Sequence, residues 1–253
     1  MKDLIIKLLG LKIIRFFGDL PSYDRWRWLK SNLRTGSLRT LDAGCGSGTF
    51  TMYAASIGNE AIGISFESSN IEKAQHRAKL LGLNNIQFIS YDLKNLSSIS
   101  NNIGLFDQVI CFETIEHIMD DHKLIADISA LIKPGGRLLL TTPYKYYRHL
   151  IGDKISEIED GGHVRWGYTF DEVSTIFSNC ALKVEMRDYL SGFVSQQICN
   201  FQRILSFVFG PFSWFIAFPF RLLLLFDKPI TKVLNYPYLC IAIVGLKEDG
   251  LGK

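Results

Sequence analysis

The sequence predicts a doubly wound α/β fold, in which helices cover both faces of a mostly parallel sheet. From residue 37 onward, short apolar runs alternate with helix-like stretches, which is typical of βαβ units. A glycine-rich segment, residues 44–48, follows the first apolar run, at the place where such sheets bind ligands. The length of 253 residues suits one such domain with insertions better than two separate domains.

The composition narrows the range of partners and cofactors. The 28 Lys and Arg residues exceed the 25 Asp and Glu residues by only three, too few for the clustered basic surface that nucleic-acid binding needs. We therefore predict no nucleic-acid partner. The five cysteines are odd in number and form no CxxC pair, so we predict reduced thiols, a cytoplasmic protein and no bound metal.

The first 36 residues are expected to form an N-terminal helical cap. Residues 1–20 place charged side chains on one half of a helical wheel and apolar side chains on the other, which predicts an amphipathic helix. Lys7, Lys12 and Arg15 interrupt every apolar run, so a secretory signal is not predicted. The helix either packs on the body of the protein or touches a membrane surface.

Residues 37–190 form the predicted core, and residues 237–253 add a last strand and a tail. A helix over residues 69–81 is expected to begin at a Ser or Asn cap and to end at Gly82. A second helix is predicted over residues 170–177, and the turn Lys133-Pro134-Gly135-Gly136 precedes the fifth strand. The seven expected strands cover residues 37–42, 60–65, 86–91, 106–112, 137–142, 182–189 and 238–245.

Glycines at positions 44, 46 and 48 follow the first predicted strand. They permit positive φ angles and let a ligand approach the backbone, while the next helix offers free N–H groups. A dinucleotide-binding fold would have G-x-G-x-x-G, but residue 49 is threonine and the spacing is G-x-G-x-G. Asp42 would repel a pyrophosphate and suits a ligand with an ammonium group. The alternative is a tight turn that binds nothing.

The segment LDAGCGSGTF, residues 41–50, resembles the first motif of class I S-adenosylmethionine-dependent methyltransferases of type 11/25. Three more matches follow in order: Asp92 after the third strand, FETIEHI at residues 112–118, and the Lys-Pro-Gly-Gly turn. The resemblance covers about residues 37–145. It implies a Rossmann-like, mostly parallel seven-stranded sheet with an antiparallel last strand, and S-adenosylmethionine as cofactor.

By this resemblance, the cofactor lies along the ends of the first four strands. Asp92 is expected to contact the adenine, and Glu113 the cofactor or the substrate. The expected cofactor-binding residues are Asp42, Gly44, Cys45, Gly46, Gly48, Ser65, Phe66, Asn70, Asp92, Leu93, Phe112 and Glu113.

The tip of the second strand departs from the common pattern of the family. Ser65 stands where most members have an acid that binds both ribose hydroxyls. The stretch resembles a subgroup with G-I-T-L-S-x-x-Q, in which Ser65 and Asn70 take the places of the Thr and the Gln. These neutral partners would form weaker bonds than a carboxylate. Glu67 is the alternative ribose ligand.

Two histidines are the predicted catalytic residues. The sulfonium methyl group is already electrophilic, so the protein mainly has to align donor and acceptor. An acceptor hydroxyl would need a general base, and histidine suits this role near neutral pH. His117 follows the fourth strand, and His163 lies in a polar loop, residues 159–166, that could cover the site. Either could instead only bond to backbone, and Glu116 is expected as a charge at a helix start.

Residues 191–236 are expected to form a long, apolar, helical insertion. Its segment 204–226 has the length of a membrane span and a single charge, Arg221. Gly210, Pro211 and Pro219 break it into shorter pieces, and a single span would separate the last strand from its sheet. The two main alternatives are a buried substrate lid and a surface that dips into a membrane.

The sequence therefore predicts a methyltransferase for an apolar, lipid-linked or other small-molecule acceptor. Peripheral membrane contact is predicted through residues 204–226. The glycine spacing argues against a nicotinamide dehydrogenase. An alternative of another class is a non-catalytic, membrane-associated protein that keeps the cofactor fold. The acceptor atom and the oligomeric state are not specified.

Overall fold

The computed structural model describes residue 10 and residues 20–248, so the amphipathic helix expected over residues 1–20 lies outside the described residues apart from positions 10 and 20. Seven strands form one sheet in the order β3-β2-β1-β4-β5-β7-β6. The pairs among β1 to β5 are parallel, and β7 runs antiparallel to both of its neighbours. The predicted fold class is confirmed. The strands are β1 (Arg39–Ala43), β2 (Glu60–Ser65), β3 (Ile86–Ser90), β4 (Phe106–Phe112), β5 (Ile132–Pro143), β6 (Leu182–Leu190) and β7 (Cys240–Lys247).

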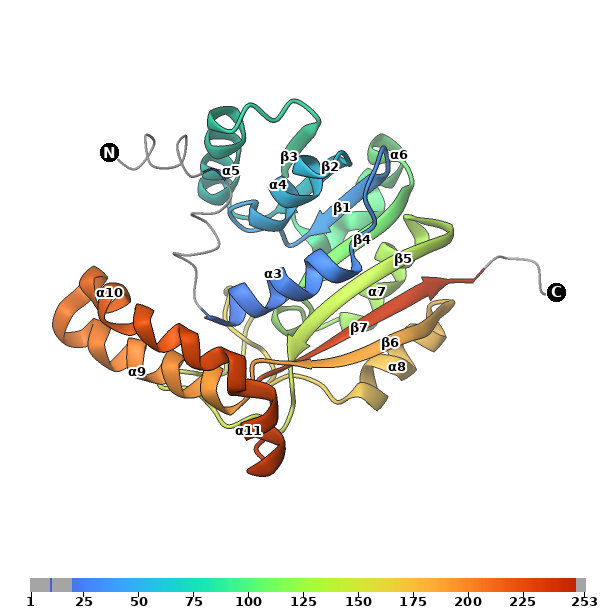
Figure 1. Cartoon of the computed structure of the whole chain (residues 1–253). Helices are drawn as coiled ribbons and strands as arrows, with labels where there is room; N and C mark the ends of the chain where they lie inside the picture. The colour runs from blue at the N-terminus through green and yellow to red at the C-terminus, as the bar shows by residue number, and fades with distance from the viewer. Residues whose placement is uncertain (1–9, 11–19, 249–253) are drawn as a thin grey trace.

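Helices cover both faces of this sheet (Figure 1). One face carries α3 (Leu20–Asn32), α4 (Thr49–Ser56) and α5 (Ser68–Leu80). The other carries η1 (Leu93–Ile99), α6 (Ser100–Ile103), α7 (Asp121–Ala130) and α8 (Phe170–Asn179), while the short η2 (Ile115–His117) follows β4. The carboxyl ends of the parallel strands therefore meet at one edge, where a ligand site is expected.

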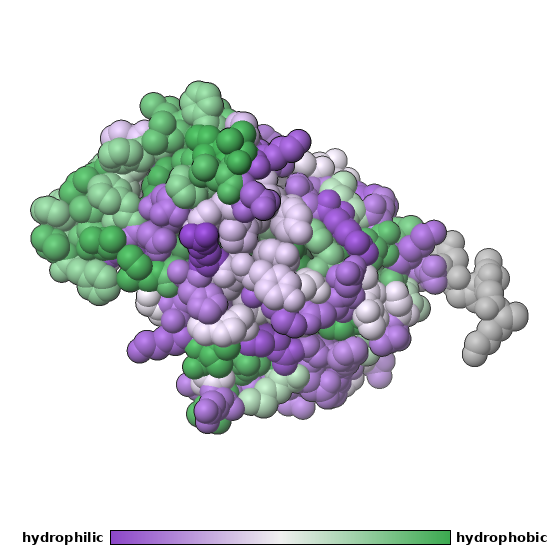
Figure 2. Space-filling model, turned by 90° about the horizontal axis from the view of Figure 1, so that it is seen from below, coloured by the Kyte–Doolittle hydropathy of each residue, from purple (hydrophilic) through white to green (hydrophobic). Residues whose placement is uncertain are grey.

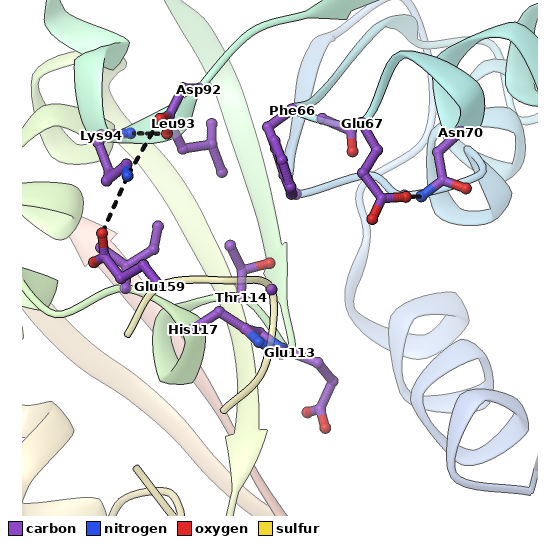
Figure 3. Close-up of a pocket in the computed structure, with 15 residues that line it drawn as sticks. Phe66, Glu67, Asn70, Asp92, Leu93, Lys94, Glu113, Thr114, His117 and Glu159 are labelled. Atoms are coloured by element: carbon purple, nitrogen blue, oxygen red, sulfur yellow. Dashed lines mark hydrogen bonds and ion pairs between the residues drawn. The ribbon is translucent and has the colours of Figure 1, made fainter. Parts of the chain in front are cut away.

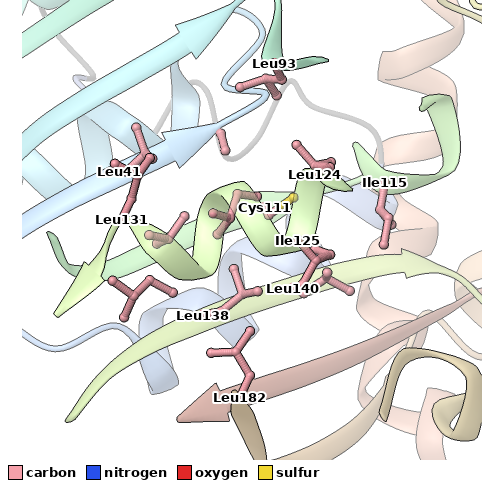
Figure 4. Packing of buried hydrophobic residues seen from close by; sticks show 14 of the residues in the cluster. Leu41, Leu93, Cys111, Ile115, Leu124, Ile125, Leu131, Leu138, Leu140 and Leu182 are labelled. Carbon is pink, nitrogen blue, oxygen red and sulfur yellow. The ribbon is translucent and has the colours of Figure 1, made fainter. Parts of the chain in front are cut away.

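Both faces of the central strands are apolar because they are buried under helices. Val109 and Cys111 of β4 belong to the cluster that packs under α7 and α8, while Ile110 and Phe112 belong to the cluster under α3 and α4. Figure 4 shows the first of these clusters, in which Leu138 and Leu140 of β5 face Leu124 and Ile125 of α7. The two clusters fix β4 on both sides and so hold the residues at its end in place.

Most element boundaries lie within two residues of the prediction, and two differences have a clear structural cause. β5 begins at Ile132, because the Lys-Pro-Gly-Gly segment lies within the strand at a register irregularity beside Phe106. Helix α5 begins after Glu67, and neither the expected Ser nor Asn provides a side-chain cap. Gly82 does follow the end of this helix with a φ of +67°.

The insertion leaves and rejoins the sheet at almost the same point. It consists of α9 (Phe193–Phe209), η3 (Gly210–Phe212), α10 (Ser213–Ala217), η4 (Phe218–Phe226) and α11 (Asp227–Val233). At its base, the Leu239 N–H donates to the Ser191 carbonyl at 2.9 Å, and Gln196 Nε2 donates to the Pro237 carbonyl at 2.8 Å. No helix among residues 20–248 is both long and apolar enough to cross a membrane.

We call residues 193–226 the apolar arm. Figure 1 shows the arm extending from the edge of the sheet, and Figure 2 shows apolar surface gathered over it. Phe207, Leu222 and Leu225 are 81%, 73% and 80% exposed. The outer part of the arm is therefore not buried as a lid would be. Its base packs on the body, where Val194 and Ile198 contact Leu20, and Arg203 pairs with Asp153.

Candidate active site

Three glycines after β1 form the floor of the site. Two of them have no room for a side chain, and the third borders open space. Their φ angles are all positive, at +89° for Gly44, +49° for Gly46 and +78° for Gly48. A Cβ at Gly44 would lie 2.1 Å from Thr114 Oγ1, and one at Gly48 would lie 2.7 Å from the Phe88 ring. A Cβ at Gly46 would meet no atom within 4 Å. Gly46 therefore leaves open space that a ligand can occupy.

Asp42 lies beneath this loop. Its carboxylate is almost fully buried and accepts a hydrogen bond from Thr51 Oγ1 at 2.6 Å. Burial raises the pKa of Asp42 from 3.8 to about 7. A cation bound nearby would favour the ionised form, so the electrostatics suit a positively charged ligand.

A cavity of about 270 Å³ opens above the loop at the carboxyl edge of the sheet (Figure 3). Nine of the residues predicted from the sequence line it: Gly44, Gly46, Ser65, Phe66, Asn70, Asp92, Leu93, Glu113 and His117. These residues follow β1, β2, β3 and β4, so the sheet topology brings together segments that are far apart in the sequence.

One end of the cavity is polar and lies after β3. Asp92 Oδ1 accepts from the Lys94 backbone N–H at 3.0 Å, which begins η1. Lys94 Nζ then reaches Glu159 Oε2 at 3.1 Å, and Glu159 also accepts from the Met119 N–H. This ion pair joins the 159–166 loop to the cavity wall, as Figure 3 shows for Lys94 and Glu159.

The segment after β2 provides another polar group. Glu67 Oε2 accepts from Asn70 Nδ2 at 2.5 Å, and Figure 3 shows the two side chains together. Ser65 is largely buried at the strand end, and Phe66 is exposed at the mouth of the cavity. Both alternatives for a diol ligand, Ser65 with Asn70 and the carboxylate of Glu67, therefore lie on the same wall.

Glu113 connects the cavity to α3. It has a φ of +48°, which is uncommon for a non-glycine residue and recurs at functional sites. Its Oε2 lies 3.1 Å from Arg25 Nη1, and its Oε1 accepts from Thr141 Oγ1 at 3.1 Å. The carboxylate is thereby held toward α3.

The two predicted catalytic histidines lie against each other. The His117 and His163 ring centroids are 4.7 Å apart, at 85°. His117 Nδ1 lies 3.0 Å from the Gly162 carbonyl, and since a carbonyl only accepts, the Nδ1–H is the donor. Burial and the neighbouring His117 lower the pKa of His163. Glu116 lies in the first turn of η2, as expected, but its side chain is fully buried.

Five predicted residues do not line the cavity. Asp42 lies under the loop, as described, and the His163 ring packs edge-on against His117. Gly48 packs against Phe88, and Cys45 belongs to the cluster under α5. The Phe112 ring packs on Phe50 and Trp28 on the opposite side.

Sequence reasoning missed some of the lining residues. Lys94, Thr114, Ile118, Glu159 and Gly161 also face the cavity. Thr114 and Ile118 belong to the same motif as His117, so their proximity could have been inferred. Glu159 and Gly161 come from a loop that the sequence places near the site only in general terms.

Known proteins match this chain over nearly the same residues as the motifs described above. A family of methyltransferase domains matches residues 35–166, about half of the chain. The ubiquinone biosynthesis O-methyltransferase of Coxiella burnetii is 30% identical over 118 residues, which cover 47% of this chain and 49% of the relative. The protein of that name from Methylocella silvestris is 33% identical over 105 residues, or 42% and 40% of the two chains. The match thus spans about half the length of these relatives.

Solved structures share the fold over most of the chain. The [4+2]-cyclase SpnF has a TM-score of 0.61 at 20% identity, covering 90% of this chain and 82% of its own. The N-methyltransferase NodS of Bradyrhizobium japonicum, solved with S-adenosylhomocysteine, has a TM-score of 0.54 at 16% identity, covering 90% and 86%. One of these relatives is named a cyclase, so the shared fold alone does not define the reaction. Together with the match over residues 35–166, the sheet order and the glycine loop show that the chain belongs to the class I S-adenosylmethionine-dependent methyltransferase family.

Proposed function

We propose that this protein transfers a methyl group from S-adenosylmethionine to a hydroxyl oxygen of a lipid-like acceptor at a membrane surface. The observation that carries the proposal is the cavity lined by the segments at the ends of β1, β2, β3 and β4, with His117 among the lining residues. The names of the curated relatives support oxygen as the acceptor atom. The exposed apolar arm supports a lipid-like acceptor.

The cavity residues fit the three parts of the cofactor. The open space at Gly46 would take the methionine part, close to the buried charge of Asp42. Asp92 would accept from the adenine amino group, flanked by Leu93 and Phe66. Glu67 would bind the ribose hydroxyls, because its Oε1 stays available while Oε2 holds Asn70. A carboxylate acceptor forms stronger bonds than the neutral pair Ser65 and Asn70.

A histidine would remove the acceptor proton. When bound, the cofactor supplies an electrophilic methyl group, and this chain must hold the acceptor oxygen in line and take up its proton. His117 donates through Nδ1 to Gly162, which leaves Nε2 as the acceptor. His163 stays neutral near pH 7, since its pKa is lowered, and it lies directly against His117.

The arm would hold the protein on the bilayer surface where such an acceptor resides. Residues 193–226 contain no Asp or Glu, while Arg203 and Arg221 provide positive charge. The Arg221 guanidinium lies 5.5 Å from the Trp214 ring centre, an arrangement suited to the interface between lipid and water. Burying each exposed Phe or Leu contributes about 2 kcal/mol, so several together give firm attachment.

The catalytic part of the proposal is tested by methyl transfer from labelled cofactor. The protein would be incubated with methyl-labelled S-adenosylmethionine and total lipid extract, and label in the organic phase would be counted. We expect transfer with the wild type and a loss of at least tenfold in His117→Ala, while His122→Ala on the exposed surface of α7 serves as the matched control. Cofactor binding by calorimetry without label in any lipid or phenolic acceptor would favour the non-catalytic alternative.

The membrane part is tested separately by flotation with anionic vesicles. Phe207→Ser with Phe215→Ser should reduce vesicle binding at least tenfold, because both side chains are well exposed and their loss leaves the fold intact. Leu105→Ser removes an exposed apolar residue outside the arm and should change nothing. Equal flotation of the double variant and the wild type, or none by either, would contradict the membrane role of the arm.

A further inference from the structure

Glu116, His117 and His163 bring a carboxylate and two imidazoles together beside the cavity. One potential ligand atom from each residue lies within 4.8 Å of the other two. His117 Nε2 is 3.9 Å from Glu116 Oε1. These two atoms come from η2, and the third group comes from the 159–166 loop. The three groups therefore converge from two separate segments.

The Glu116 carboxylate is the least ordinary member of this cluster. Its side chain is fully buried, and Oε2 accepts from Thr142 Oγ1 at 3.1 Å. Oε1 is also buried but accepts no hydrogen bond among the described residues. A buried carboxylate oxygen without a partner is costly and indicates a missing donor or cation. The nearest ring nitrogen, at 3.9 Å, is too far for a hydrogen bond.

The hydrogen bonds around the cluster prepare its atoms as ligands. His117 donates its Nδ1–H to the Gly162 carbonyl, so the Nε2 lone pair faces Glu116 Oε1. Thr142 fixes the other carboxylate oxygen. Outer partners of this kind orient the ligands of metal sites, where a histidine bonds through one nitrogen and donates through the other.

We propose that Glu116, His117 and His163 bind a divalent transition-metal ion, with zinc as the prime candidate. Two nitrogens and one oxygen suit zinc and its neighbours better than magnesium or calcium, which prefer oxygen. Three protein ligands leave a position open, as in reactive zinc sites. Bonds of about 2.1 Å place ligand atoms roughly 3.4 Å apart, so the three groups, whose ligand atoms lie within 4.8 Å of one another, must draw closer when the ion binds.

A bound ion would connect the 159–166 loop to the end of β4. Its open position would lie beside the cavity, next to His117. On the basis of the proposed function, an acceptor hydroxyl coordinated there would release its proton to solvent more readily. His117 Nε2 would then be a ligand and not a base, so the two roles of this nitrogen exclude each other.

Cobalt provides a direct test that does not depend on turnover. Full-length protein freed of metal by a chelator would be titrated with Co²⁺, followed by its visible absorption and by calorimetry. We expect one ion per chain. His163→Ala and Glu116→Gln should weaken binding at least 100-fold, and Thr142→Val about tenfold, as expected for an outer partner. His122→Ala removes a histidine outside the cluster and should leave affinity unchanged.

The outcomes separate this proposal from the proposed function. No Co²⁺ bands, or unchanged affinity in His163→Ala, would overturn the metal site, and His163→Ala remains informative if Glu116→Gln does not fold. S-adenosylhomocysteine affinity would be measured in the same chelated samples. Cofactor binding without cobalt binding would leave the methyltransferase proposal standing, whereas cobalt binding without cofactor binding would overturn that proposal alone.

Discussion

Two glycines of the loop after β1 should respond differently to the same small change. Gly44→Ala places a methyl group 2.1 Å from Thr114 Oγ1, at a φ of +89°. Gly46→Ala places it in open space, at a φ of +49°. We expect the first substitution to reduce stability and the second to reduce cofactor affinity.

The sizes of the two effects follow from the local geometry. A left-handed conformation costs a non-glycine residue about 1 to 2 kcal/mol, and both variants pay this cost. Overpacking adds about 1 to 3 kcal/mol at Gly44, because Thr114 cannot retreat without loosening its 3.0 Å hydrogen bond to the Phe112 carbonyl. The Tm of Gly44→Ala should therefore lie about 2 to 12 °C below that of Gly46→Ala, at about 2 to 4 °C per kcal/mol.

Thermal unfolding and calorimetry with S-adenosylhomocysteine measure the two effects. Thr114→Ala removes the atoms that clash, so the double variant with Gly44→Ala should recover part of the loss, a coupling of about 1 to 2 kcal/mol. Gly46→Ala should lower affinity about tenfold or more, and Gly46→Val should abolish binding. Equal Tm values for the two alanine variants together with no coupling to Thr114 would refute the reasoning.

Three further predictions concern charge, the adenine contact and capping. In the folded state, the pKa of Asp42 is raised from 3.8 to about 7, so the folded protein holds this proton more tightly than the unfolded chain does. The free energy of unfolding should therefore fall by up to about 4 kcal/mol as the pH rises from about 4 through 7. Asp42→Asn should remove this fall in a Tm series against pH, and an unchanged slope would contradict it. Asp92→Asn can keep the hydrogen bond from the Lys94 N–H, so it should leave the Tm unchanged. We expect it to weaken cofactor binding by about 1 kcal/mol through loss of the adenine contact. Unchanged cofactor affinity would place the adenine elsewhere. Thr169→Ala breaks the capping box of α8 and should lower unfolding free energy by about 1 kcal/mol in urea titration; no change would mean that the cap is replaced by water.

The sheet could be predicted well because its signals are local. β2 and β4 have the expected bounds, since each contains a short apolar run, residues 61–64 and 109–112, beside polar residues. The start of β5 was less predictable: Pro and two glycines are typical of a turn, but here they form a bulge within a paired strand. Whether these residues form a turn or a bulge depends on the pairing of β5 with β4, so it cannot be predicted from the sequence of β5 alone.

The site could be predicted where it depends on strand ends and not where it depends on loops. Residues after β1 to β4 come together because parallel strands end at the same edge. The contact of His163 with His117, and that of Glu159 with Lys94, depends on the path of a loop far along the chain. The exposure of the arm could not be predicted either, since an apolar run has the same sequence pattern whether it faces protein or lipid.

The closed base of the insertion has a consequence for how such proteins diversify. Because the chain leaves after Ser191 and returns at Leu239 through a direct backbone hydrogen bond, the intervening segment can lengthen, shrink or be exchanged without changing the register of β6 and β7. Selection can therefore alter the surface of this segment while the residues around the glycine loop stay constant. A chimera that carries a polar segment in place of residues 207–226, with the packed base of the insertion retained, should keep its fold and, on the proposed function, lose its attachment to vesicles.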